Sequence, residues 1–230
     1  MGSSIAACIL AAGHEVISLV KHPDEADVAR ERIFGHLQQL HLEGILKEDP
    51  QQVLRRHTIT DDVTLLKENE VVIESITEDT AEKKAVYQKL ESVLSPQAII
   101  GSNTSAIPVS VLQDGLRYPA RFLGIHWGEP AHITRFMEVI CGRQSDIRCA
   151  QKIIALAATW NKEPSLLKKD IRGFITNRIM YAMMCEAFYL VENGYATVED
   201  VDRSLRNDLG FWITFAGPFR FMDLTGIPLT

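Results

Sequence analysis

The order of strand-like and helix-like segments constrains this chain most. Short apolar runs of β type recur at residues 14–20, 57–60, 70–76, 98–101, 121–127 and 135–140. Amphipathic patterns lie between several of them. The clearest runs from Thr80 to Leu94, where Val86, Leu90 and Val93 share one helical face. This alternation is typical of parallel strands joined by crossover helices, so we expect an α/β layer architecture.

Two helices are predicted near the N-terminus. Residues 3–12 are rich in Ala and other small residues, and Gly13 stands where the helix should stop. Pro23 opens a longer helix. Its apolar positions recur every three or four residues, at Ala26, Ala29, Ile33, Leu37 and Leu40.

The character of the sequence changes near residue 170, and no strand is predicted from Gly173 onward. Apolar residues between Ile175 and Leu190 predict a long helix that ends at Asn193-Gly194. Thr197 to Asp200 resembles a capping box, which starts a second helix. Gly217-Pro218 opens a third segment. We therefore predict a first domain at residues 1–170 and an all-helical piece at 171–230.

Composition excludes several classes of protein. The 230 residues carry 24 Lys and Arg against 30 Asp and Glu, a net charge of -6, which argues against a nucleic-acid partner. The apolar run at residues 5–12 is too short to cross a membrane and lacks the basic flank of a signal peptide. The cysteines have no metal-type spacing and are expected to be free thiols, so we predict a cytoplasmic protein without a metal.

Three polar segments are candidates for chemistry. The first, GSNTSAIP at residues 101–108, follows a buried-looking strand. Ligands bind at the carboxyl ends of strands in open parallel sheets. A polar loop that caps the next helix is the alternative.

The second candidate, residues 124–140, contains His126 and Glu138 on two β runs separated by a Gly/Pro turn. If the runs pair like a hairpin, the two side chains face each other, and a carboxylate beside an imidazole makes a general base. The alternative is a structural His and a surface Glu. The third candidate is Asn177, early in the long helix, where a solvated side chain is the alternative.

Together, in this order and spacing, these segments resemble the 3-hydroxyacyl-CoA dehydrogenase family over essentially the whole chain. The family includes relatives that oxidise small hydroxy acids such as L-gulonate and L-carnitine. The matching segments are AAGHEV, VVIESITED, SNTS, GIH with the Glu of MEVI twelve residues later, GFITNR and AGPFRFMDLTG.

The resemblance implies a Rossmann-like, doubly wound, mostly parallel sheet that binds NAD, followed by a partial helical domain for substrate and dimer contacts. It implies an oxidoreductase of fatty acid metabolism. The enzyme would transfer hydride between a 3-hydroxyacyl-CoA, such as 3-hydroxybutyryl-CoA, or a small hydroxy acid, and NAD(P). A homodimer is expected for the full-length protein. The other interpretation is a non-catalytic structural or binding protein, because the family includes an abundant lens crystallin.

The resemblance also assigns roles to residues on the substrate side. His126 would take the hydroxyl proton, and Glu138 would hold and polarise His126. Ser105 and Asn177 would hydrogen-bond the substrate oxygen.

On the cofactor side, Asn103 would lie near the nicotinamide and Glu78 in the cofactor cleft. Lys83 would stand near the cofactor and substrate entry. Gly2 is the last glycine of the family's phosphate-binding fingerprint.

The sequence departs from the family pattern in three places. Glu129 adds a carboxylate near His126, so the family resemblance does not determine which hydroxyacyl or hydroxy-acid substrate is bound. Lys21 follows the second strand close to where the family has a ribose-binding acid, and a cation there tolerates or favours NADP. A surface lysine with the usual NAD is the alternative. The family's first strand and first two glycines have no counterpart before Gly2. We therefore expect two unpaired strand edges inside the sheet and weak NAD binding by the chain as written.

Overall fold

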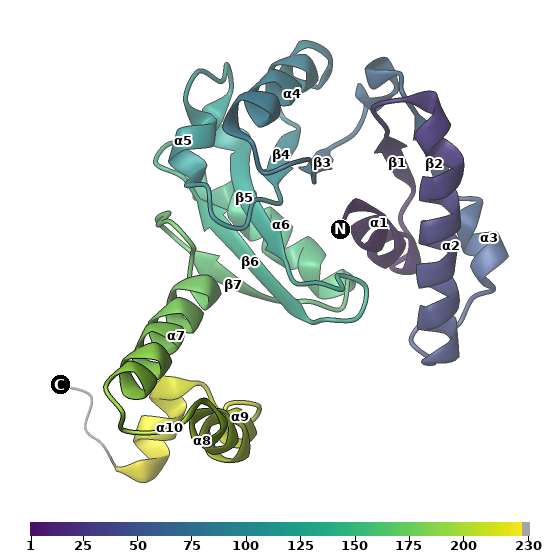
Figure 1. Ribbon diagram of the computed structural model, residues 1–230. Helices are drawn as coiled ribbons and strands as arrows, with labels where there is room; N and C mark the ends of the chain where they lie inside the picture. Colours follow the sequence, from purple (N-terminus) through teal and green to yellow (C-terminus); the bar gives the residue numbers. More distant parts are fainter. Residues whose placement is uncertain (227–230) are drawn as a thin grey trace. The chain divides into compact units, whose positions relative to one another are not determined.

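The computed structural model describes residues 1–226 (Figure 1). The chain forms two compact units, Met1–Ile175 and the helical part from Thr176 onward. Each unit is described by itself below.

The strands of the first unit form two sheets. β1 (Val16–Leu19) pairs in parallel with β2 (His57–Thr60). The larger sheet has the order β3-β4-β5-β6-β7. Its strands are β3 (Val71–Glu74), β4 (Ile99–Ser102), β5 (Phe122–Trp127), β6 (Phe136–Cys141) and β7 (Glu163–Leu167). All pairs are parallel except β5 with β6, so the predicted α/β class with a mostly parallel sheet is confirmed.

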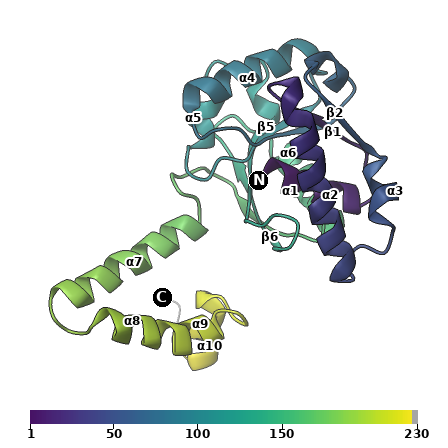
Figure 2. The same ribbon diagram turned by 45° about the vertical axis from the view of Figure 1, so that its right-hand side comes forward.

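The helices of the first unit connect these strands (Figure 2). They are α1 (Gly2–Ala11), α2 (Ala26–Leu42), α3 (Pro50–Leu54), α4 (Thr80–Val93), α5 (Val109–Gln113) and α6 (Ile147–Thr159). Short 3-10 turns lie at η1 (Pro23–Glu25), η2 (Val63–Leu66) and η3 (Pro119–Arg121). Gly13 follows α1 with φ +92°, a conformation that favours glycine, which explains why the helix ends there.

The core covers both faces of the larger sheet. On one face, Cys8 of α1 and Ile153 of α6 pack against Leu123 and Val139. On the other face, Leu90 of α4 and Leu112 of α5 pack with Ile100 and Phe122. A third cluster joins α1 to α2 through residues such as Leu10, Ile33 and Leu37. These layers hold the strand ends that carry the candidate site.

The second unit is helical. It contains α7 (Thr176–Glu192), α8 (Val198–Ser204), a π-helical turn η4 (Leu205–Leu209), α9 (Gly210–Trp212) and α10 (Pro218–Thr225). Gly194, with φ +73°, follows α7, and the Thr197 hydroxyl accepts the N–H of Asp200, so the predicted helix end and cap are present. Within residues 1–226, no helix has the length and apolarity needed to cross a bilayer.

Candidate active site

A histidine and a glutamate meet on adjacent strands. β5 and β6 pair antiparallel with His126 directly opposite Glu138, and side chains of directly opposite residues share one face of a sheet. His126 Nδ1 lies 2.8 Å from Oε2 of Glu138. His126 is 8% exposed and Glu138 is 1% exposed. The structure therefore brings together the two residues that the sequence predicted as an acid–imidazole pair.

The chain after β7 folds back onto this pair. The Phe174 ring lies 5.6 Å from the His126 ring, and the Phe136 ring lies 5.4 Å from it. The backbone N–H of Ile175 donates to Oε1 of Glu138 at 3.0 Å. Phe174 reaches this position with φ +54°, which is strained for a bulky residue. Both oxygens of Glu138 are thus engaged, and its position is fixed.

The pair has the chemistry of a general base. When the Glu138 carboxylate accepts the Nδ1–H of His126, the lone pair of the imidazole stays on Nε2. The carboxylate also stabilises the imidazolium that forms after proton uptake. An Nε2 lone pair held in this way can remove a proton from an alcohol.

The loop after β4 adjoins His126. Strands β3, β4 and β5 are parallel, so their carboxyl ends meet at one edge of the sheet. Asn103, just after β4, accepts the backbone N–H of Trp127 on Oδ1 at 2.9 Å. Ser105, two residues further, is exposed. This edge therefore collects two of the predicted site residues beside the imidazole.

Glu78 orders the same loop. Its Oε1 accepts the Thr104 hydroxyl at 2.5 Å and the backbone N–H groups of Ser105 and Ala106 at 2.9 and 3.2 Å. Partial burial works to raise the pKa of Glu78, but the hydrogen bonds from Thr104 and Ser105, with the charge of Lys83, outweigh it and lower the pKa. Glu78 is therefore an anion that holds the loop carrying Ser105.

Lys83 lies beneath Glu78 and is fully buried. Its Nζ lies 2.7 Å from Oε1 of Glu74 and 3.4 Å from Oε2 of Glu78. The hydroxyl groups of Tyr87 and Ser102 donate to Oε2 of Glu74 at 2.5 and 2.9 Å. Burial, followed by the charge of Glu74, raises the pKa of Tyr87 well above its ordinary value, so its hydroxyl keeps the proton that it donates. The structure thus places Lys83 in a buried charge network under the loop.

The start of α1 offers an anion site of the kind a dinucleotide needs. α1 begins at Gly2 without a side-chain cap. A Cβ on Gly2 would lie 3.7 Å from Cβ of Ser75, just beyond β3. The buried Ser75 hydroxyl has no hydrogen-bond partner in the described part of the chain. Free N–H groups at a helix start and an unused hydroxyl suit a pyrophosphate, so these residues fit NAD.

The end of β1 carries charges of both signs. Lys21 is exposed, and its backbone N–H donates to Oε2 of Glu25 at 3.2 Å. A carboxylate therefore stands beside the lysine that the sequence offered as a reason for NADP tolerance.

Two further residues of the sequence prediction lie outside these strands and outside the loop after β4. Asn177 lies in the first turn of α7, in the second unit. Glu129 is exposed in the turn between β5 and β6, where it precedes a cis Pro130.

Comparisons with known proteins identify the family. The profile of the 3-hydroxyacyl-CoA dehydrogenase NAD binding domain matches residues 1–171, and that of the 3-hydroxyacyl-CoA dehydrogenase C-terminal domain matches residues 173–230. The chain belongs to the 3-hydroxyacyl-CoA dehydrogenase family. The resemblance seen in the sequence is thereby confirmed, and this dehydrogenase is an NAD-dependent oxidoreductase.

Individual relatives cover nearly the whole chain. A 5-formyl-3-hydroxy-2-methylpyridine 4-carboxylate 5-dehydrogenase from Mesorhizobium japonicum is 30% identical over 230 residues, which is 100% of this chain and 74% of the relative. A 3-hydroxybutyryl-CoA dehydrogenase from Mycobacterium tuberculosis is 32% identical and covers 99% and 79% of the two chains. A crystal structure of an NAD+-dependent 5-formyl-3-hydroxy-2-methylpyridine 4-carboxylic acid 5-dehydrogenase superposes with a TM-score of 0.88 at 31% identity, over 99% of this chain and 73% of that one.

Sequence reasoning missed three contributors to the site of this dehydrogenase. Glu74 follows directly after the apolar residues Val71–Ile73. A charged residue at the end of an apolar strand was the feature that could have identified it. Tyr87 and Phe174 gave no signal, because both look like ordinary apolar positions in their helical and loop contexts. Tyr87 contributes by its contact with Glu74 of β3, and Phe174 by its contact with His126 of β5; these contacts join segments that are separated in the sequence.

Proposed function

We propose that this dehydrogenase oxidises the secondary alcohol of a 3-hydroxyacyl-CoA to the ketone with NAD as hydride acceptor. The His126–Glu138 pair at 2.8 Å carries the proposal, because alcohol oxidation requires a base at the carbinol oxygen. Relatives named 3-hydroxybutyryl-CoA and 3-hydroxyadipyl-CoA dehydrogenase support the thioester class. The intact pair also favours an enzyme over a non-catalytic protein of the same fold.

In this mechanism the protein handles the proton. Nε2 of His126 removes the hydroxyl proton, and Glu138 stabilises the imidazolium that results. NAD, when bound, supplies the hydride acceptor. The exposed Ser105 hydroxyl hydrogen-bonds the reacting oxygen. The role that the family resemblance gives to Asn177 stays a prediction. Asn103 and Glu78 keep the loop after β4 beside the imidazole. A positioned base of this kind contributes about 10²–10⁴-fold to the rate.

The direct test is formation of reduced nicotinamide from NAD and 3-hydroxybutyryl-CoA. His126→Gln should lower kcat/KM by about 10²-fold or more, whereas His41→Gln, at an exposed position near the end of α2, should leave it unchanged. Turnover by His126→Gln equal to that of the parent would overturn the assignment. A substrate panel that adds a free hydroxy acid and a pyridine carboxylate distinguishes the thioester class from the alternatives.

Further properties stay predictions. NAD is the expected cofactor, with NADP a possible substitute because of Lys21. A homodimer is supported by exposed aromatic residues of the second unit, such as Phe188, Phe215 and Phe219. A role in fatty acid metabolism follows from the thioester substrate. The four free cysteines suit the cytoplasm.

A further inference from the structure

A carboxylate from a distant segment caps the start of α5. The residue before this helix is Pro108, whose side chain makes no capping hydrogen bond. Asp170 takes that role, because the backbone N–H of Ser110 donates to its Oδ2 at 2.6 Å and the Ser110 hydroxyl donates to its Oδ1 at 2.9 Å. The N–H groups at a helix start need such acceptors. Two charge-assisted hydrogen bonds therefore tie Asp170 to α5.

Ser110 also connects this contact to the strand that carries Glu138. Its hydroxyl oxygen accepts the backbone N–H of Arg143 at 2.8 Å. Arg143 follows β6, which ends at Cys141. Asp170 is thereby linked to the end of β6 as well as to α5.

The residues that follow Asp170 form a turn that ends at the active site. The backbone N–H of Phe174 donates to the carbonyl of Ile171 at 3.1 Å and closes this turn. Phe174 has φ +54°, a conformation that a bulky residue keeps only where the surrounding structure enforces it. The next residue, Ile175, donates its N–H to Oε1 of Glu138 at 3.0 Å. The turn is therefore a short, strained connection between Asp170 and Glu138.

α5 anchors this turn at two points. Phe174 is 1% exposed and belongs to the same core cluster as Val109 and Leu112 of α5. Asp170 supplies the second anchor through Ser110. An apolar contact holds a side chain in place without fixing its direction, whereas a bidentate hydrogen-bonded contact also fixes the orientation. The direction in which the Ile175 N–H points thus depends on Asp170.

We propose that Asp170 is a positioning residue of the active site. It fixes the turn at residues 171–175 so that the Ile175 N–H orients Glu138, and Glu138 in turn orients His126. This inference rests on the proposed function, in which His126 is the base. Asp170 itself touches neither His126 nor Glu138 through any hydrogen bond described above, so it acts through the turn.

Hydrogen exchange measured by NMR tests the positioning without any substrate. In Asp170→Asn an amide nitrogen replaces one of the two acceptors, so one of the bonds from Ser110 is lost. The exchange of the Ile175 amide should accelerate at least about ten-fold more than that of Val139, which lies in β6 between two neighbouring strands. A general loss of stability would act on Val139 at least as strongly. Asp49→Asn makes the same change at the cap of α3 and should leave both amides unchanged.

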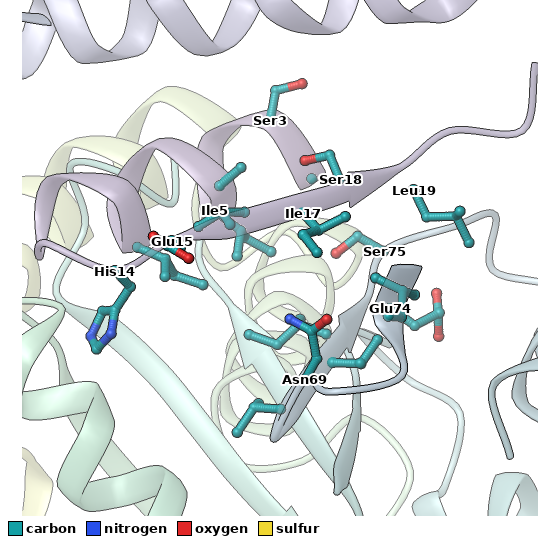
Figure 3. Close-up of a pocket in the computed structure, with 18 of the residues that line it drawn as sticks. Ser3, Ile5, His14, Glu15, Ile17, Ser18, Leu19, Asn69, Glu74 and Ser75 are labelled. Carbon is teal, nitrogen blue, oxygen red and sulfur yellow. The ribbon is translucent and has the colours of Figure 1, made fainter. Parts of the chain in front are cut away.

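The residues that fit NAD provide an internal control. Figure 3 shows Ser3 of α1 and Ser75 after β3 beside the cavity at the start of that helix, and among the described residues neither Asp170 nor Ile175 lines it. Asp170→Asn should therefore leave the dissociation constant for NAD within about two-fold of the parent value. A rise in this constant as large as the loss of kcat would mean that the variant disturbs the whole unit, and it would overturn the proposal.

A double-mutant cycle tests whether Asp170 acts through Glu138. Asp170→Asn should lower kcat for 3-hydroxybutyryl-CoA by about ten-fold, because a small displacement of a catalytic group is costly. In a Glu138→Gln background the same substitution should lower kcat by less than about two-fold, since the group that it positions is already altered. Two rate losses that simply multiply would overturn the proposal, as would parent-like exchange of the Ile175 amide in Asp170→Asn.

The two readouts separate this inference from the proposed function. A parent chain that does not oxidise 3-hydroxybutyryl-CoA would contradict the proposed function, and the exchange of the Ile175 amide would then decide the role of Asp170. Circular dichroism establishes that each variant folds. If Asp170→Asn does not fold, Ser110→Ala takes its place, because it removes the hydroxyl bond to Asp170 and keeps the bond from the backbone N–H. The same directions of change are expected.

Discussion

The backbone N–H of Ile175 donates a hydrogen bond to Oε1 of Glu138 over 3.0 Å. The other oxygen of the same carboxylate holds Nδ1 of His126 at 2.8 Å. Ile175, the last residue of the first unit, thus orients Glu138, and Glu138 orients His126. The catalytic geometry depends on a main-chain group as well as on two side chains.

Glu138→Gln should lower kcat/KM by about 10²–10⁴-fold, because a glutamine amide can donate to Nδ1 and favour the wrong imidazole tautomer. Glu163→Gln, which alters an exposed pair with Arg135, is the matched control. Turnover by Glu138→Gln equal to that of the parent would show that the carboxylate is not needed to orient His126.

Phe174→Ala should lower the free energy of unfolding by about 3–5 kcal/mol, because the ring is 1% exposed and its removal leaves a cavity beside His126. Ala and Phe both carry a Cβ, so the strain of the positive φ remains and the difference reports packing. Urea denaturation measures the effect. Phe188→Ala, at an exposed position of α7, should change stability by less than about 0.5 kcal/mol. A similar loss in both variants would contradict the assigned role of Phe174.

Lys83→Met should lower the free energy of unfolding by about 3–5 kcal/mol, because it leaves the buried Glu74 without its cation. Lys84→Met removes the neighbouring lysine, whose Nζ lies 3.5 Å from the exposed Asp114, and should cost about 0–1 kcal/mol. Chemical denaturation of both variants gives the comparison. Equal effects would mean that the buried network adds nothing to stability.

Stability should fall as pH falls through the range in which buried histidines resist protonation. Burial, followed by the nearby His36 and Lys162, lowers the pKa of His132 from 6.5 to about 4. Burial, followed by Arg30, lowers the pKa of His57 from 6.5 to about 4. Between these values the unfolded chain binds more protons than the folded chain, so the free energy of unfolding decreases as pH falls from about 6.5 to about 4.

Urea midpoints across that pH range measure the effect. Nδ1 of His132 lies 2.7 Å from the Ser4 hydroxyl, and its Nε2–H donates to Oε1 of Gln39 at 2.8 Å. His132→Gln therefore keeps a polar side chain there while removing one titrating group. In this variant the free energy of unfolding should fall less steeply as pH falls, and the remaining decrease should come from His57. A slope identical to that of the parent would contradict the prediction for His132.

Substitutions of Lys21 and of Glu25 should change the preference for NADP over NAD in opposite directions. The sequence predicts the ribose at this end of β1, where the Glu25 carboxylate would repel a 2′-phosphate and the Lys21 side chain would attract one. Glu25→Gln should lower KM for NADP by about five-fold, and Lys21→Gln should raise it by a similar factor, as expected for exposed charges worth about 1 kcal/mol. KM for NAD is the internal reference. If KM for NADP is unchanged in both variants, this end of β1 does not select the cofactor.

Much of the fold follows from local patterns in the sequence. The alternation of β runs and helical faces predicts the α/β class, and Gly13, Gly194 and Thr197 lie at helix boundaries as expected. Glycines after helices and hydroxyl caps act within a few residues, so their effect is readable without the fold. β7 was missed because the segment Glu163–Leu167 contains Pro164 and is half exposed, as edge strands are.

The site divides in the same way. The sequence predicted that His126 and Glu138 can face each other if their two β runs pair like a hairpin, and the family resemblance assigned their roles. The antiparallel register of β5 and β6 places the two residues opposite each other. Only the tertiary structure decided that Ile175 and Phe174 contact this pair and that Lys83 is buried against Glu74. It also decided that β1 and β3 line one cavity. These contacts join segments far apart in the chain, and packing rather than local conformational preference determines which of them form.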